Sequence, residues 1–175
     1  VWGALLAWSL LDMGLWRVAW LLWVQCRRGL RPGESLKLTG RDLVPPAAHV
    51  AGGTVAVLLL GVRAGTKAKR PQVVRVEDEG DARLAAGMKA VTTEMEPLTH
   101  VRTLNGYNIL VHRAADVRGV GHAGWSAHSP RAGFVTGRFL EGDKPAGIAA
   151  VTRRMSLKSL QSYLDVQAVA AGQLG

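Results

Sequence analysis

The first 26 residues, VWGALLAWSLLDMGLWRVAWLLWVQC, hold five of the six tryptophans and restrict most strongly how this chain can fold. Asp12 and Arg17 interrupt the apolar stretch, which leaves it short of the ~18 uninterrupted apolar residues that a membrane-spanning helix needs. No small-residue cleavage signature follows, as it would after a signal peptide. Three tryptophans recur at i, i+4 and i+7: Trp16, Trp20 and Trp23. This spacing predicts helices that pack into a core rather than a membrane anchor.

The chain of 175 residues is long enough for one domain with a core of its own. The single cysteine, Cys26, excludes an internal disulfide framework and a cysteine-rich zinc site. A single cysteine fits a reducing, intracellular compartment, which includes the nucleus. The chain does not begin with methionine, so we expect that an upstream region is missing.

The formal net charge of +9 favours a polyanionic partner, either nucleic acid or a membrane surface, over a small neutral substrate. Much of this charge falls in three runs: Arg27, Arg28 and Arg31; Lys67, Lys69 and Arg70; and Arg153, Arg154 and Lys158. A single run of charge is usually just a solvated face, but three runs of one sign favour a polyanion-binding function.

The pattern of apolar residues predicts an α+β fold that is mostly helical with a small antiparallel β-sheet. A helix over 15–28 should stop near Gly29, and a short helix should start at Pro32. The apolar runs TVAVLLLGVR and RPQVVRVED, joined by the turn AGTKAK, predict a hairpin with lysines at its tip. Further helices are predicted over 81–95, 98–115, 130–140, 145–153 and 156–170.

Two short stretches carry residues of chemical interest. In AHSPR, His128 and Arg131 are three positions apart, so one turn of helix places them on one face. An imidazole and a guanidinium that converge suit a phosphate or a carboxylate, although two residues on a solvated face are the simpler interpretation. In the predicted last helix, Tyr163 lies off the leucine stripe, either as a core-edge tyrosine or as a functional one.

The order Arg31, Lys67, His128-x-x-Arg131, Tyr163 resembles that of the tyrosine recombinases, the phage-type integrase family. RGLRPGESLKLTGRDLVPP is similar to the family's first-arginine box, and GTKAKRPQVVRV to its lysine hairpin. AHSPRAGFVTGRFLEGD is similar to the His-x-x-Arg box, and RRMSLKSLQSYLDV to the nucleophile segment. The resemblance covers nearly all of residues 1–175 and implies a catalytic domain without its upstream core-binding domain. The residues of these motifs are most similar to those of divergent integrase-like proteins of dinoflagellates.

The resemblance implies a role for each matching residue. Tyr163 would attack a DNA phosphodiester and form a 3′-phosphotyrosyl bond, while Arg31 and Arg131 hold the non-bridging oxygens. His128 would activate the phenol, and Lys67 would protonate the 5′ leaving oxygen. Four further cations are expected to hold backbone phosphates: Lys69, Arg70, Arg153 and Lys158. The partner is then double-stranded DNA, with self-association on the DNA, and the chemistry needs no metal or cofactor.

One position departs from the family. Nine residues before Tyr163 the family has a histidine or a tryptophan, and this chain has Arg154. Arg154 is either a third phosphate contact or the mark of a decayed site. Two alternatives therefore stay open, a catalytically decayed DNA-binding relic and a basic membrane-surface protein that uses its tryptophan-rich start. Tyr107 is the other tyrosine, and four histidines are expected to be structural or exposed: His49, His100, His112 and His122.

Overall fold

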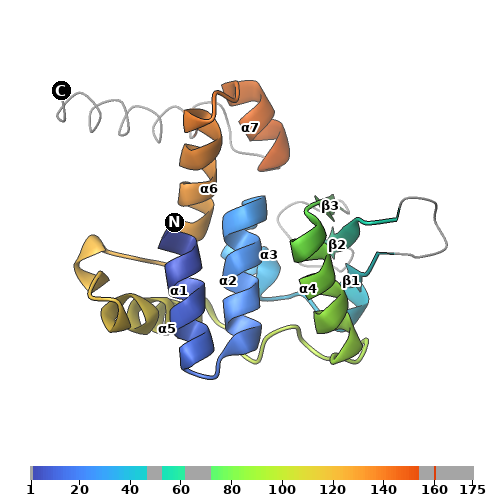
Figure 1. The fold of residues 1–175 in the computed structure, drawn as a ribbon, viewed down its shortest axis with the longest axis horizontal. Helices are drawn as coiled ribbons and strands as arrows, with labels where there is room; N and C mark the ends of the chain where they lie inside the picture. Colours follow the sequence, from blue (N-terminus) through green and yellow to red (C-terminus); the bar gives the residue numbers. More distant parts are fainter. Residues whose placement is uncertain (1, 47–52, 62–71, 154–159, 161–175) are drawn as a thin grey trace.

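The computed structural model describes residues 2–46, 53–61, 72–153 and 160 (Figure 1). Within these residues the chain forms seven α-helices and a three-stranded antiparallel sheet, so the predicted mostly helical α+β class is confirmed. The elements are α1 (Trp2–Asp12), α2 (Trp16–Arg28), α3 (Pro32–Ser35), the 3-10 turn η1 (Gly40–Asp42), β1 (Leu43–Val44), β2 (Ala56–Leu60), β3 (Gln72–Val76), α4 (Glu79–Ala90), α5 (Leu104–Val117), the 3-10 turn η2 (Gly121–Ala123), α6 (Ser129–Leu140) and α7 (Pro145–Val151). None of the helices in the described residues is long and apolar enough to cross a bilayer.

The end of α2 follows the sequence prediction closely. Gly29 adopts the left-handed conformation at φ 60° and its N–H donates to the carbonyl of Gln25, which closes the helix. Arg31 is extended and Pro32 is the first residue of α3, as its fixed φ favours. A Cβ at position 29 would come within 2.6 Å of the Phe134 ring on α6. Gly29 is therefore required both by the turn and by the close approach of α6.

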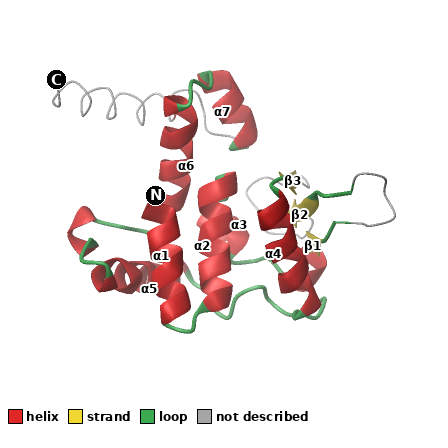
Figure 2. Ribbon diagram, viewed as in Figure 1, coloured by secondary structure: helices red, strands yellow, loops and turns green. Residues whose placement is uncertain are grey.

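The sheet has the order β1-β2-β3 with antiparallel pairing throughout. Leu58 in the central strand is opposite Leu43 on one side and Val74 on the other, and all three are buried. Figure 2 shows the strands together at one side of the helices, beside α4, which contacts each of them. The predicted antiparallel pairing of the two apolar runs is confirmed, and the turn with its lysines lies outside the described residues. β1 was not predicted, because two residues are too few to show an alternating pattern.

The buried apolar residues form two separate clusters. The larger one joins α1, α2, α4, α5 and the sheet. The smaller one contains Val135 of α6, Ile148 of α7 and Leu160, with Phe134 packed against it. In Figure 1, α6 and α7 extend beyond the ends of α1 and α2, which explains why they need apolar contacts of their own.

Several predicted helix boundaries are corrected by the caps. The helix predicted over 81–95 is α4, which starts earlier because the Asp78 side chain accepts from the Asp81 N–H, and which ends at Ala90. The helix predicted over 98–115 is α5, which starts after Thr103, whose side chain accepts from the Gly106 N–H. The helices predicted over 130–140 and 145–153 match α6 and α7 within two residues. The helix predicted over 156–170 lies outside the described residues, apart from Leu160.

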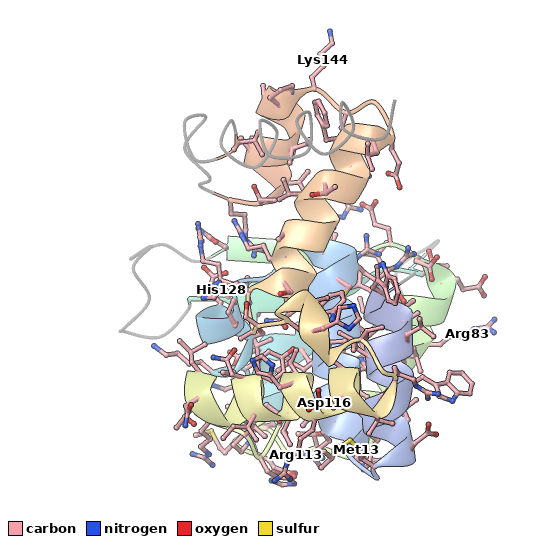
Figure 3. All side chains as sticks on the ribbon, turned by 90° about the vertical axis from the view of Figure 1, so that its left-hand side faces the viewer. Met13, Arg83, Arg113, Asp116, His128 and Lys144 are labelled. Carbon is pink, nitrogen blue, oxygen red and sulfur yellow. The ribbon has the colours of Figure 1, made fainter. Side chains whose placement is uncertain are left out.

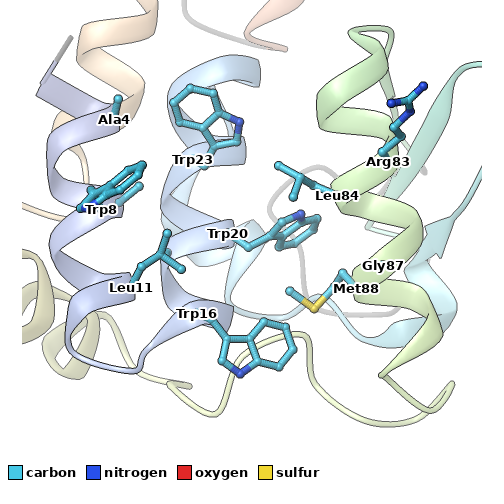
Figure 4. Close-up of a pocket in the computed structure, with 12 residues that line it drawn as sticks. Ala4, Trp8, Leu11, Trp16, Trp20, Trp23, Arg83, Leu84, Gly87 and Met88 are labelled. Carbon is cyan, nitrogen blue, oxygen red and sulfur yellow. The ribbon is translucent and has the colours of Figure 1, made fainter.

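The tryptophans do not all pack into the core. Trp20 is buried, but Trp16 is 44% exposed, so the prediction is wrong for Trp16. Together with Trp8, which is 64% exposed, these residues line an apolar groove of about 590 Å³ between α1, α2 and α4 (Figure 4). The i, i+4, i+7 spacing correctly predicts a shared apolar stripe, but a stripe can line a groove as well as a core.

We predict that Gly29→Ala lowers the free energy of unfolding by about 2 to 3 kcal/mol, because alanine is strained at positive φ and its Cβ meets the Phe134 ring. Gly133→Ala is the matched control, because Gly133 lies inside α6 with open space beside it. There alanine should stabilise the protein by about 0.5 to 1 kcal/mol. Urea denaturation of the two variants measures the difference, and equal stabilities would contradict the account of Gly29.

Candidate anion-binding site

Arg131 is the buried centre of the site. It lies in the first turn of α6 and its side chain donates to two backbone carbonyls. Nη1 donates to Gly29 at the end of α2, and Nη2 donates to Thr152 after α7 at 2.7 Å. A buried guanidinium needs such acceptors, because its charge is costly to remove from water. Arg131 therefore connects the ends of α2 and α7 to the start of α6.

Arg31 reaches the same turn from the other side. Its Nη2 donates to the carbonyl of Arg153 at 3.1 Å, across 122 positions of sequence. Its Nη1 lies 2.9 Å from Glu34 Oε1, and its side chain remains 32% exposed. Arg31 and Arg131, both predicted from the sequence, thus hold consecutive carbonyls, those of Thr152 and of Arg153, itself a predicted phosphate contact.

Arg153 has the most unusual conformation in the described part of the chain. It is the one non-glycine residue there with a positive φ, at 53°. Its Nη2 lies 3.3 Å from Glu34 Oε2 and its side chain is 10% exposed. Its Nε and Nη1 are buried and have no hydrogen-bond partner. Burial lowers the pKa of Arg153 below its ordinary value; the Glu34 carboxylate opposes this shift, and the charge of Arg31 adds to it.

Glu34 is the carboxylate that holds two of these cations. Its two oxygens contact Arg31 and Arg153 separately, one each. Its position in the first turn of α3 follows from the Pro32 start of that helix. In these contacts two guanidiniums share one carboxylate, and Arg131 holds the neighbouring carbonyl of Thr152, so the cations outnumber the carboxylate and the site suits an anion.

A buried chain of hydrogen bonds fixes the backbone of Arg31. Ser35 Oγ donates to the carbonyl of Arg31 at 2.9 Å, and Gln25 Nε2 donates to Ser35 Oγ at 2.8 Å. Tyr107 Oη on α5 donates in turn to Gln25 Oε1. All three of these side chains are fully buried. These hydrogen bonds were not predicted from the sequence, where the available signal was one glutamine, Gln25, within the apolar first 26 residues.

Tyr107 is structural in this arrangement. Burial raises its pKa well above the ordinary value, and the nearby Cys26 adds to the effect. A phenol that is fully buried and hard to ionise is not a suitable nucleophile for an external ligand. Tyr107 therefore belongs to the buried hydrogen-bond network and not to an exposed surface.

His128 and Arg131 lie within one helical turn, as predicted, but in different surroundings. His128 immediately precedes α6 with helical backbone angles, and its carbonyl accepts from the Ala132 N–H. Its side chain is exposed, whereas Arg131 is buried. Figure 3 shows His128 at the start of α6. The three other histidines in the described segments, His100, His112 and His122, are exposed as expected.

The first basic run carries less free charge than the sequence indicates. Arg27 lies 3.2 Å from Asp81 and 3.4 Å from Asp78, and Arg28 lies 3.6 Å from Asp81. Trp23 Nε1 also donates to Asp81 at 2.6 Å, so this carboxylate ties α2 to α4. Arg27 and Arg28 serve packing between helices, and Arg31 is the member of this run that joins the site.

Six predicted site residues lie outside the described residues: Lys67, Lys69, Arg70, Arg154, Lys158 and Tyr163. His49 lies outside them too. In the described segments no group of three or more His, Cys, Asp or Glu side chains is arranged to hold a metal ion. Comparison with protein families, with curated proteins and with solved structures finds no match to this chain.

We predict that Tyr107→Phe lowers the free energy of unfolding by about 1 to 3 kcal/mol, because it leaves Gln25 Oε1 buried without a donor. Urea denaturation measures this loss. Ser35→Ala breaks the same chain at its other end, so the double variant should lose less than the sum of the two single variants. Additive losses would show that the chain does not act as one unit.

Proposed function

We propose that this chain is the catalytic domain of a DNA strand-cleaving and rejoining enzyme of the tyrosine recombinase type. One observation supports it above the others: Arg31 and Arg131, two members of the ordered set, converge on the Thr152–Arg153 turn. This turn comes ten positions before Tyr163 in the sequence. Two arginines that meet next to the segment with the proposed nucleophile are what phosphodiester chemistry needs.

In the proposed reaction, Tyr163 Oη attacks the scissile phosphorus as the bond to the 5′ oxygen breaks. His128 takes the phenol proton, and Lys67 gives a proton to the leaving 5′ oxygen, so charge and atoms balance. The product is a 3′-phosphotyrosyl bond, and the reverse step with another 5′ hydroxyl rejoins the strand. The partly exposed Arg31 would contact the non-bridging oxygens.

In this proposal Arg131 positions the start of α6 and also contributes positive charge beside the phosphate. Its bonds to Gly29 and Thr152 hold the start of α6 against the turn, and so hold the exposed His128 near it. The strands that flank the predicted lysine turn, β2 and β3, lie against α4 on the other side of α2 (Figure 1). DNA that contacts both the start of α6 and this sheet would lie across the end of α2.

A decayed DNA-binding relic is the second candidate, and two observations favour it. Arg154 replaces the family's histidine or tryptophan. Arg31 and Arg153 also both contact Glu34, which leaves less positive charge to stabilise a transition state.

The membrane-surface alternative is favoured by a different observation, the exposed side chains of Trp2 and Trp8. Cosedimentation with anionic vesicles, compared with a DNA pull-down, separates that alternative from the two DNA-binding proposals.

We predict that Tyr163→Phe abolishes covalent adduct formation on a nicked suicide substrate and leaves DNA affinity nearly unchanged, because only the nucleophilic oxygen is removed. Denaturing gel electrophoresis of protein and labelled DNA measures the adduct. An adduct formed by the phenylalanine variant would contradict the assignment of Tyr163. A wild-type protein that binds DNA without forming an adduct would favour the relic, and Arg154→His then tests whether cleavage can be restored.

We predict that affinity for DNA falls steeply with salt, since the proposed contacts are to phosphates. Each neutralised phosphate contributes about −0.9 to the slope of log K against log salt concentration. With three or more contacts, the slope should be about −2.7 or steeper. Fluorescence anisotropy of a labelled duplex between low and physiological salt measures it, and a flat response would contradict phosphate binding.

A further inference from the structure

The conformation of Arg153 is unfavourable in three independent ways. Its backbone is in the left-handed region, which a residue with a Cβ rarely adopts. Its guanidinium is nine-tenths buried beside a second cation, Arg31. Two of its nitrogens, Nε and Nη1, have no hydrogen-bond partner. Strained residues with unpaired buried donors cluster where a ligand later supplies the missing partners.

The contacts of Arg153 do not require an arginine for folding. The bond from Arg31 goes to the backbone carbonyl of residue 153, which any residue would offer. The left-handed backbone would suit glycine better. Within the described residues, the side chain of Arg153 has one partner, Glu34, which lies 3.3 Å from its Nη2. Burial also lowers the pKa of Arg153 despite Glu34, so the charged side chain is held at a net cost.

We infer that Arg153 is a phosphate-binding arginine that rests on Glu34 when no ligand is present and is transferred to a DNA phosphate on binding. This inference rests on the proposed function and deepens it. It assigns the third cation of the pocket to Arg153, beside the Arg154 that the family spacing indicates. The guanidinium turns from Glu34 toward the phosphate, which offers acceptors to Nε and Nη1 together. Arg31 and Arg131 meanwhile keep the turn in place through its carbonyls.

The decisive variant is Arg153→Gly, which removes the guanidinium and fits the left-handed backbone. Arg102→Gly is the matched control, because Arg102 is exposed in the loop before α5 and its loss changes the net charge equally. Three measurements are made on wild type and both variants. They are the midpoint of thermal unfolding, its rise on addition of inorganic phosphate, and the Kd for a DNA duplex.

We expect Arg153→Gly to unfold at the same temperature as wild type or higher, because strain and a buried charge are removed. We also expect it to lose the phosphate-dependent rise and to bind DNA about 10-fold or more weakly, as for a lost charge-assisted hydrogen bond. Arg102→Gly should keep the phosphate-dependent rise and most of the affinity. Arg153→Lys should recover part of the affinity, because it restores one cation without the two unpaired donors.

The inference is overturned if Arg153→Gly unfolds at a lower temperature and binds DNA as tightly as the control, since Arg153 would then be structural. It is also overturned if phosphate stabilises wild type and Arg153→Gly equally. The proposed function is tested separately, by whether wild type forms a covalent adduct with DNA. A protein that forms no adduct, but loses its response to phosphate on Arg153→Gly, still supports the anion site.

Discussion

The interaction on which the rest of the site depends is the buried guanidinium of Arg131 between the carbonyls of Gly29 and Thr152. A cation removed from water loses several kcal/mol of solvation unless its N–H groups find acceptors. Both acceptors here belong to the backbone at helix ends, where carbonyls lack helical partners. The position of α6 is therefore set by where α2 and α7 end. The left-handed Gly29 matters for the same reason, since it directs the free carbonyl and admits Phe134.

Two kinds of interaction hold the other residues of the site, a neutral hydrogen-bond chain and an ion-pair network. From below, the uncharged chain from Tyr107 through Gln25 and Ser35 fixes the backbone of Arg31, and it is fully buried. From above, the Glu34 carboxylate separates two guanidiniums that would otherwise repel each other. The first support is neutral and should resist changes in salt. The second is an ion-pair network, which an anionic ligand can replace because it offers the same kind of acceptor.

The described structure also separates charge from apolar surface. The arginine cluster lies where α2, α6 and α7 meet, while the exposed Trp8 and Trp16 line a groove between α1, α2 and α4. Asp81 contributes to this separation, because it holds Trp23, Arg27 and Arg28 in one set of contacts and directs those arginines toward α4. Arg28 and Arg31, three positions apart in the sequence, thus belong to different sets of contacts.

The sequence by itself determined the helices and strands whose ends or patterns depend on a few neighbouring residues. Gly29 and Pro32 marked the end of α2 and the start of α3, and two β-branched runs marked β2 and β3, because backbone preferences act within a few residues. Arg153 was predicted as a phosphate contact, and Arg31 and Arg131 were predicted as site residues through their order along the chain. Only the tertiary structure decided that they meet at Thr152–Arg153, that Arg153 is strained, and that Tyr107 and Gln25 lie beneath them. The Arg31–Arg153 and Tyr107–Gln25 contacts join residues 122 and 82 positions apart, and such pairs leave no periodic trace because they form only when helices pack together.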